Sequence, residues 1–335
     1  MLRIYLLKRI ARVVPILLLV SIVTFALLHL APGGPVSVMT GNPKVTGADL
    51  DRIRESYGLD KPLPLQYLIW TRQVFLRFDF GTSYVTGEPV SRMILDRLPA
   101  TLELMAISFT LALALSILVG AYSALRQGTL ADDIVSFIST AGISAPVFWI
   151  GLMAIAFFSL QLGILPSGGR EAIAEGGSIT DRLGHLVLPV SVLTLAYFSS
   201  WTRYVRSSVL EAVRGDFVRT ARAKGLNEQA VILKHVMRNA LLPVVTIVFM
   251  QIPTLFTGAV ITETVFAWPG MGRLFYDGLV RHDYTRVMGI VVVVTIIIIF
   301  FNLLGDLVCM AIDPRYAPSG EKRDAARRYN LGGAV

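Results

Sequence analysis

The sequence predicts an all-α polytopic membrane protein with six transmembrane helices. Hydrophobic residues make up 54% of its 335 residues and charged residues only 16%, and the mean hydropathy is +0.64. A spanning helix needs about 20 apolar residues, and six stretches reach that length. They lie near 11–31, 100–125, 134–164, 185–205, 240–264 and 287–311. Basic residues concentrate after the fourth stretch, which indicates the side on which the connecting segment lies.

The first stretch begins like a secretory signal. Three bases, Lys8, Arg9 and Arg12, precede an apolar run that ends at Leu30. This run is longer than the roughly 7–15 residues of a signal-peptide core, and no small-x-small cleavage site follows it. We therefore expect residues 1–31 to form a cytoplasmic N-terminus and a retained first transmembrane helix.

Residues 32–99 are predicted to form a small helical segment outside the membrane. The stretches Ala48–Tyr57 and Leu65–Phe78 have helical patterns, and an Asp-Lys-Pro-Leu-Pro run at 60–64 separates them. Aromatic side chains in the second stretch suit the headgroup layer. Two interpretations stay open, a cap on the membrane bundle and a docking surface for an external partner.

The third stretch is longer than a single span requires. We expect residues 134–164 to tilt, to kink at Pro146 or to continue outside the bilayer. Six alternating spans place 126–133, 206–239 and the chain end on the inner side. Residues 313–335 are polar, and we expect them to be a disordered cytoplasmic tail.

The segment between the fourth and fifth stretches is the most informative. Lys and Arg number eight from Arg203 to Arg238, which places 206–239 on the cytoplasmic side. Apolar residues at spacings of three to five predict two short amphipathic helices that are divided by Gly225. The segment is longer than a connector needs to be, and it is typical of a docking element for a soluble partner. The net charge of +8 thus follows from topology, without nucleic-acid binding.

Several kinds of chemistry have no support in the sequence. It contains no GxxxxGK[ST] phosphate loop, no HExxH and no CxxC motif. The four histidines are scattered without ligand spacing, and Cys309 is the single cysteine. We therefore expect no catalytic, metal-binding or cofactor-binding residue in this chain.

Two alternatives to a passive membrane subunit stay open. Ser144, in an apolar helix, is the candidate nucleophile of an intramembrane protease, with His185 or His282 as its base, although serine in membrane helices more often packs or bonds across helices. Asp306, in the last span, is the candidate site of an ion-coupled carrier. Such carriers usually have a midplane carboxylate or broken helices in two repeats, and we find no inverted repeat.

Uncharged polar residues in the last two spans are the better candidates for lining a translocation path. These are Gln251, Thr254, Thr257 and Asn302. Gln251, Thr254 and Gly258 are spaced i, i+3 and i+7, which places them on one face of a continuous helix. Interhelical hydrogen bonding and close packing are the alternative explanation.

Motifs along nearly the whole chain resemble those of one protein family. They are Gly58–Leu63, Gln66–Tyr67, Asp79–Ser83, Arg97–Leu104, Asp216–Leu226, His235, Arg238–Ala240, Leu242–Pro243, Thr262–Phe266, Trp268–Gly272 and Asp313–Arg315. In this order, over about 1–316, they resemble the permease subunits of ABC importers, and more closely the dipeptide/oligopeptide branch. Asp216–Leu226 resembles the cytoplasmic EAA loop of that family. Arg219-Thr220-Ala221 stands where the general pattern has Glu-Ala-Ala, and Gly34 stands where the branch commonly has Asp.

The resemblance implies a type I importer permease fold. Residues 97–312 would form a core of five helices, with 206–239 as the coupling loop. A second, similar permease, two cytoplasmic ATPases and an extracytoplasmic substrate-binding protein are the implied partners. The location would be a bacterial or archaeal cytoplasmic membrane with both termini inside. ATP and Mg²⁺ would be held by the ATPases, so this chain is expected to be a non-catalytic subunit.

The resemblance also implies which residues couple the permease to the ATPases. They are Asp216, Arg219, Ala221, Arg222, Lys224 and Gly225. Small Ala221 and Gly225 would let a helix seat closely in an ATPase groove. The bases would pair with acids there, unless they serve only to set topology. Peptides are the expected substrates, and glutathione, nickel chelates and oligosaccharides are alternatives, because selection is implied to lie largely in the binding protein.

Overall fold

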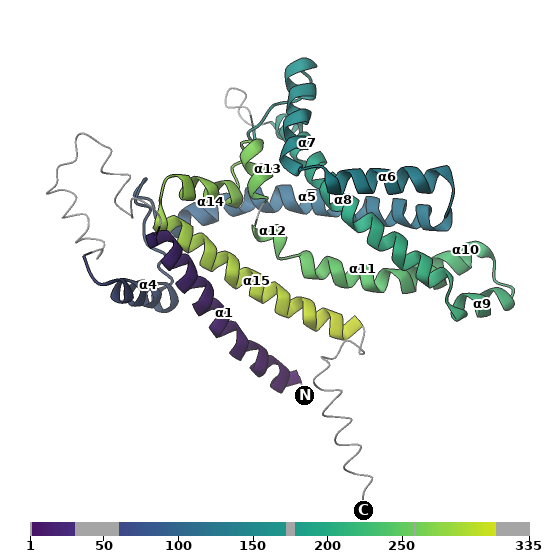
Figure 1. The fold of residues 1–335 in the computed structure, drawn as a ribbon, viewed down its shortest axis with the longest axis horizontal. Coiled ribbons are helices and arrows are strands. Elements are labelled where there is room, and N and C mark those ends of the chain that lie inside the picture. The colour runs from purple at the N-terminus through teal and green to yellow at the C-terminus, as the bar shows by residue number, and fades with distance from the viewer. Residues whose placement is uncertain (1, 31–59, 172–177, 258, 313–335) are drawn as a thin grey trace, which may run out of the picture.

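The chain folds into a bundle of long helices. A computed structural model describes residues 2–30, 60–171, 178–257 and 259–312 (Figure 1). Those residues contain helices, turns and a single isolated bridge between Thr82 and Pro89, and no strand. The all-α prediction is therefore confirmed for them. The predicted helix Ala48–Tyr57 and the tail at 313–335 lie outside the described residues.

The long helices match the predicted spans in position. Four stretches in the described residues are long and apolar enough to cross a membrane, and one bent pair of helices supplies a fifth. The four are Val90–Leu125, Ile179–Val213, Glu228–Val265 and Tyr284–Gly305. Helix α1 (Leu2–Leu30) occupies the place of the predicted first span, and its part Pro15–Leu27 is apolar. The count of six stays a prediction.

The long third stretch is bent. Helix α6 (Leu130–Ser144) is followed by α7 (Val147–Ala154) and a π-helix η1 (Ile155–Gln161), and the two parts are bent by 101°. Ala145 is extended at φ −82° and ψ 130°, as expected for the residue before a proline, and Pro146 begins α7. The expected kink at Pro146 is therefore confirmed.

The fifth stretch is divided as well. Helix α11 (Met237–Gln251) ends in a turn at Ile252 and Pro253, then come α12 (Thr254–Thr257) and α13 (Val260–Val265). Proline has no N–H to continue the helical ladder, which accounts for the break at Pro253. A continuous helix over 240–264 is therefore wrong, and with it the argument that Gln251 and Thr254 share one helical face.

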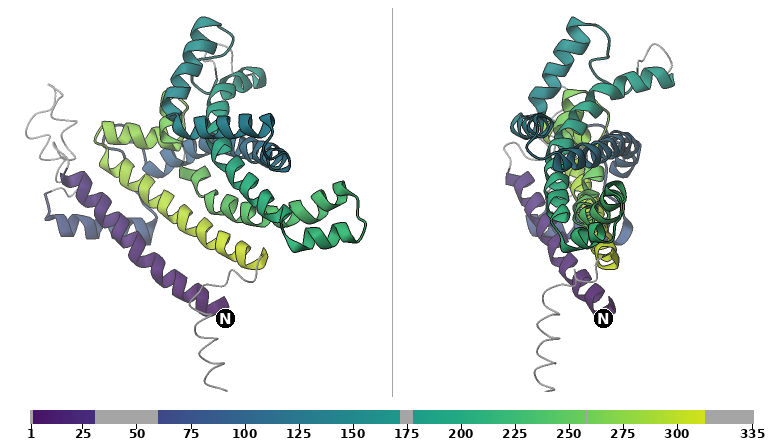
Figure 2. Two further views of the ribbon diagram at one scale, coloured as in Figure 1. Left: turned by 45° about the vertical axis from the view of Figure 1, so that its right-hand side comes forward. Right: turned by 90° about the vertical axis from the view of Figure 1, so that its right-hand side faces the viewer.

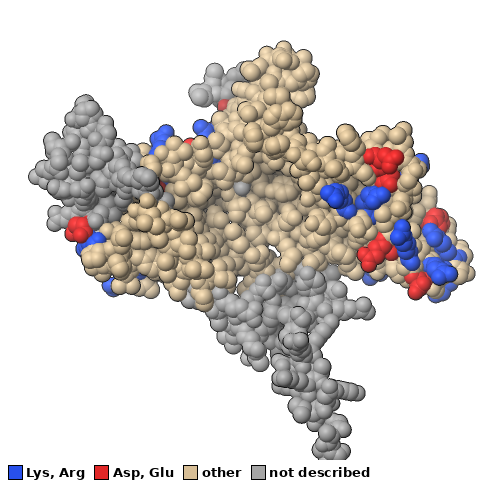
Figure 3. All heavy atoms as spheres, viewed as in Figure 1, with Lys and Arg blue, Asp and Glu red and all other residues tan. Residues whose placement is uncertain are grey.

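Helices α5 (Val90–Leu125) and α8 (Ile179–Val213) form the centre of the bundle. They approach closely at Gly120, where an added Cβ would lie 2.9 Å from both the carbonyl oxygen of Thr202 and the Cβ of Val205. Helices α1 and α15 (Tyr284–Ile312) lie side by side along one flank (Figure 2). Charged side chains gather at the end where α9 and α10 lie, while most of the remaining surface in this view is uncharged (Figure 3).

Buried polar contacts hold the opposite end together. The carboxylate of Asp283 accepts hydrogen bonds from the Ser83 hydroxyl at 2.5 Å and from the Tyr84 backbone N–H at 3.2 Å. Arg286 lies 3.1 Å from the same carboxylate, and both charged side chains are buried. These contacts fasten the segment before α5 to the start of α15. The predicted helix Leu65–Phe78 is present as α4 (Leu63–Arg77).

A second cluster joins α8 to α5 at that end. One carboxylate oxygen of Glu103, on α5, accepts hydrogen bonds from Arg170 at 2.7 Å and from Arg182, on α8, at 2.6 Å. Further along, the buried carboxylate of Glu263 accepts from the Thr101 hydroxyl at 2.9 Å and from the Arg273 N–H at 3.0 Å. The second bond caps α14 (Met271–Val280) at its N-terminus, where a carboxylate is favourable.

Candidate functional site

The predicted cytoplasmic docking element is a pair of helices at the charged end of the molecule. Helix α9 (Asp216–Ala223) is followed by a turn, and α10 (Glu228–Ala230) then runs through a π-helix η2 (Val231–Val236) into α11. Gly225 lies in the turn at φ +77°, in the left-handed region that favours glycine. The predicted division at Gly225 is therefore confirmed, and the second helix continues directly into the fifth span.

One face of α9 packs against the chain's own membrane helices. Val218 and Ala221 are three residues apart and share this face, and they are 0% and 4% exposed. They belong to one apolar cluster with Val205 and Val209 of α8 and with Val231 of η2. Ala221 thus faces its own chain, and not the solvent side on which an ATPase groove would lie. Its small side chain allows α9 to lie close to α8.

The other face of α9 is charged and open to solvent. The side chains of Asp216 and Arg219 are 98% and 83% exposed, and their charged groups are 4.0 Å apart. Lys224, just before the turn, is exposed as well. A partner would meet these side chains first, because Val218 and Ala221 point away from it.

Arg222 binds within the chain. Its guanidinium donates to Glu228 at 2.6 Å and 3.1 Å, across the Gly225 turn. This hydrogen bond to Glu228 raises the pKa of Arg222 above its ordinary value. The side-chain amide oxygen of Asn227 accepts from the Ala230 N–H at 2.7 Å and caps α10. The ion pair and the cap hold the two helices in one hairpin geometry.

The predicted path residues lie in and beside the broken part of the fifth span. The hydroxyl of Thr254 donates to the carbonyl oxygen of Gln251 at 2.6 Å, and that of Thr257 donates to the carbonyl oxygen of Thr254 at 3.0 Å. Asn302 is exposed on α15. The rings of Phe256 and Phe301 stack with centroids 4.6 Å apart, which brings α12 beside this part of α15. Gly258 lies outside the described residues.

The protease arrangement does not form in this structure. The hydroxyl of Ser144 donates to the carbonyl oxygen of Thr140 at 2.9 Å, and His185 Nδ1 lies 2.9 Å from the carbonyl oxygen of Asp181. His282 is in the turn before α15. The side chain of Asp306 lies outside the described residues. Within the described part of the chain, no three His, Cys, Asp or Glu residues gather as a metal site.

A buried ion pair that could not be predicted from the sequence joins α6 to α8. Asp132, near the start of α6, is 4% exposed, and Arg206 of α8 binds it with two bonds of 2.7 Å and 2.8 Å. The Ser123 hydroxyl donates to it at 2.5 Å and the Gly128 N–H at 3.0 Å. The pair ties the turn between α5 and α6 to the inner end of α8. The sequence offered only the Asp132-Asp133 doublet as a signal.

Known proteins similar to this chain agree with these features. Residues 116–318 match the family described as binding-protein-dependent transport system inner membrane component, and residues 1–105 match its N-terminal family. The oligopeptide transport system permease protein AppB of Bacillus subtilis is 42% identical over 312 residues, which is 93% of this chain and 98% of AppB. The dipeptide transport system permease protein DppB of Escherichia coli K12 is 37% identical, with the same shares covered.

Solved structures show the same fold. The MetNI methionine ABC transporter in an inward-facing conformation matches with a TM-score of 0.53 at 19% identity, over 66% of this chain and 97% of that chain. An amino acid ABC transporter matches with a TM-score of 0.52 at 14% identity, over 66% and 94%. The type I importer permease fold and the multi-pass membrane character are thereby shown. The chain therefore belongs to the binding-protein-dependent transport system inner membrane components, the permease subunits of ABC importers, as its motifs predicted.

Proposed function

We propose that this chain is the permease subunit of an ABC importer for di- and oligopeptides. The observation that carries the substrate class is the 37–42% identity, over 93% of the chain, to permeases named for dipeptide and oligopeptide transport. The chain pairs with a second, similar permease to enclose the path. An extracytoplasmic binding protein delivers the peptide. Both termini lie in the cytoplasm of a bacterial or archaeal cell.

Two cytoplasmic ATPases drive the cycle and hold the ATP and Mg²⁺, and this chain carries no catalytic residue. The exposed face of α9, with Asp216, Arg219 and Lys224, is the surface that docks on an ATPase. Its solvent exposure and its place at the charged end of the molecule support this role (Figure 3). Arg222 and Gly225 contribute by fixing the turn that presents the surface.

Movement of α9 passes to the membrane through its buried face. Val218 and Ala221 belong to one apolar cluster with Val209 of α8 and Val231 of η2, and α9 packs on η2, so a push on α9 reaches η2 directly and α8 through the shared cluster. The Asp132–Arg206 pair carries it on to α6. The spans then reorient around a path shared with the second permease, with Gln251, Thr254, Thr257 and Asn302 as proposed lining residues. This coupling converts movement of the ATPases into opening of the path first to one side of the membrane and then to the other.

Site-directed crosslinking tests the docking surface. In a Cys309→Ser background, which removes the single cysteine, Lys224→Cys is expected to crosslink to an ATPase of the complex. Arg92→Cys, whose side chain is exposed at the opposite end of α5, is the matched control and should not crosslink. Crosslinking at both positions, or only at Arg92→Cys, would contradict the assignment.

Transport by the purified complex tests the function as a whole. Proteoliposomes that contain both permeases and the ATPases, supplied with the binding protein, should accumulate a labelled dipeptide only when ATP is present on the ATPase side. A protonophore should not abolish uptake while ATP is maintained. Uptake that needs an ion gradient and not ATP would support the ion-coupled carrier instead.

A further inference from the structure

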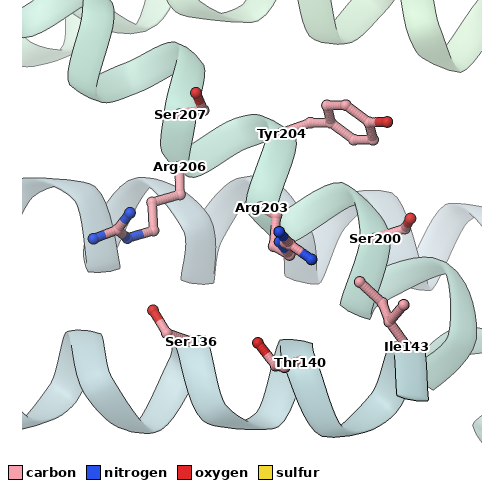
Figure 4. Close-up of a pocket in the computed structure, with 8 residues that line it drawn as sticks. All are labelled: Ser136, Thr140, Ile143, Ser200, Arg203, Tyr204, Arg206 and Ser207. Atoms are coloured by element: carbon pink, nitrogen blue, oxygen red, sulfur yellow. The ribbon is translucent and has the colours of Figure 1, made fainter. Parts of the chain in front are cut away.

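A polar groove lies between α6 and α8 and is lined in part by Arg206 of the ion pair described above (Figure 4). Its volume is about 620 Å³. From α8 it is lined by Ser200, Arg203, Tyr204 and Ser207, which are spaced i, i+3, i+4 and i+7 and so form one stripe. Ser136, Thr140 and Ile143 line it from α6 with the spacing i, i+4 and i+7. Two stripes on neighbouring helices therefore face each other, and all but one of these side chains are polar.

Such a groove does not suit a lipid-facing surface. Helix α8 is one of the membrane-spanning candidates, and α6 is half of the bent one. Ionisable side chains at membrane depth are costly in hydrocarbon and normally face a water-filled cavity or another protein. The opposite face of α8 is buried in the bundle through Trp201, Val205 and Val209. The groove thus lies on the side of α8 that is turned away from the bundle, at the inner end of the predicted fourth span.

The charge of the groove is unbalanced. Arg206 is neutralised by its two bonds to Asp132. Arg203 is exposed and takes part in no ion pair or hydrogen bond found among the described residues. Figure 4 shows its guanidinium group in the space between α8 and Thr140, with Ser200 further along the groove. A planar guanidinium with hydroxyl groups around it is suited to binding a carboxylate through two parallel hydrogen bonds.

We propose that Arg203, helped by the hydroxyls of Thr140 and Ser200, binds the C-terminal carboxylate of the peptide at the cytoplasmic end of its passage, beyond the proposed lining residues of α11, α12 and α15. This inference rests on the proposed peptide import and adds a contact for the part that all unmodified linear peptides share. A carboxylate that gives up part of its water shell in the groove needs a charged, hydrogen-bonding partner such as Arg203. A positive site that ignores side-chain identity would serve transport of peptides of varied sequence.

An anionic lipid headgroup is the competing occupant, and the lining disfavours it. Helix α6 starts at the cytoplasmic side, and α8 ends there, so the Ser200 and Thr140 end of the groove is the deeper one. A lipid would place its acyl chains at that end, yet Ile143 is the single wholly apolar side chain that lines the groove. The groove also lies on the helix whose Val205 and Val209 share an apolar cluster with Val218 and Ala221 of α9, so its opening can follow the ATPase.

The test compares two substrates in the reconstituted complex with saturating binding protein. The probes are trialanine with a free C-terminus and trialanine C-terminal amide, both labelled, and the readout is the ratio of their uptake rates. We expect Arg203→Gln to lower the free-acid to amide ratio on the order of 10- to 100-fold, as for loss of a charge-assisted hydrogen bond. Arg203→Lys should restore part of the ratio, and Thr140→Val should lower it by a smaller factor.

Arg126→Gln is the matched control, because it removes one exposed positive charge near the same end, outside the groove. It should leave the ratio unchanged. Assembly with the ATPases and basal ATP hydrolysis verify that each variant folds. If Arg203→Gln does not assemble, the ratio measured for Thr140→Val tests the proposal in its place.

Equal slowing of both peptides by Arg203→Gln, or an unchanged ratio, would overturn the carboxylate site while leaving peptide import intact. A defect that depends on the phosphatidylglycerol content of the vesicles, and not on the peptide terminus, would assign the groove to a lipid. Failure of the unmodified complex to import either peptide would instead overturn the proposed function, and this inference with it.

Discussion

Substitutions of Gly225 can show whether a docking defect is caused by the backbone conformation of the turn or by the size of the new side chain. Gly225 has φ +77°, and a Cβ added there would meet nothing within 4 Å. A substitution therefore causes no clash inside this chain, and its cost is conformational. A left-handed backbone costs about 1–2 kcal/mol for most L-residues, and less for asparagine, which can hydrogen-bond locally.

The magnitude follows from that cost. If Gly225→Ala disfavours the hairpin geometry by about 1–2 kcal/mol, the docking-competent turn falls roughly 5- to 30-fold in relative population. Apparent affinity for the ATPase falls by nearly the same factor when the competent form becomes the minor one. We expect the docking affinity, and uptake at limiting ATPase, to decrease in the order Gly, Asn, Ala, Val. Valine comes last because its β-branch tolerates positive φ least.

The assay is titration of detergent-solubilised permease pairs with purified ATPase, followed by uptake in proteoliposomes. Size alone would rank alanine above asparagine, since alanine adds the smaller group. A result in which Gly225→Ala performs better than Gly225→Asn would refute the backbone argument and indicate steric contact with the ATPase.

Two further predictions concern stability. Asp132→Ala removes a buried carboxylate that accepts four hydrogen bonds and should lower the free energy of unfolding by about 1–3 kcal/mol, because the Arg206 side chain is 27% exposed and water can solvate it. Denaturant unfolding in micelles measures this loss, and the exposed neighbour variant Asp133→Ala should change little; similar losses would contradict the ion-pair account. Gly272→Ala should cost about 1–3 kcal/mol, because the new Cβ would lie 2.7 Å from the Cα of Val260. Gly184→Ala, whose Cβ would meet Pro166 at 3.8 Å, is the control, and equal effects in a thermal unfolding scan would argue against a backbone clash.

Features that depend on local sequence were predictable. The apolar stretches identified the membrane helices, Pro146 marked the bend in the third, and Gly225 marked the division of the cytoplasmic segment. Each depends on properties of a few adjacent residues. The side of α9 that faces inward was not predictable, because Val218 is part of that face only through the apolar cluster that it forms with residues of η2 and α8.

Contacts between residues that are far apart in the chain could not be predicted from the sequence. Asp132 binds Arg206, which is 74 residues away. Arg203 counted only as a sign of topology, and its place in a groove depends on the rotation of α8 relative to α6. No periodicity within one helix specifies that rotation. The four predicted path residues stay a prediction, and the break at Pro253 removes part of their original basis.

The close approach of α5 and α8 at Gly120 gives α8 a point about which it can pivot. If α8 turns as a rigid rod about the contact near Val205, its inner arm to Val213 is about 12 Å long and its outer arm to Arg182 about 35 Å, at about 1.5 Å per residue. A displacement of about 1 Å at the inner end then becomes about 3 Å at Arg182. That is enough to break the 2.6 Å contact between Arg182 and Glu103. A small displacement at the C-terminal end of α8 would thus break the ion pair near its N-terminal end.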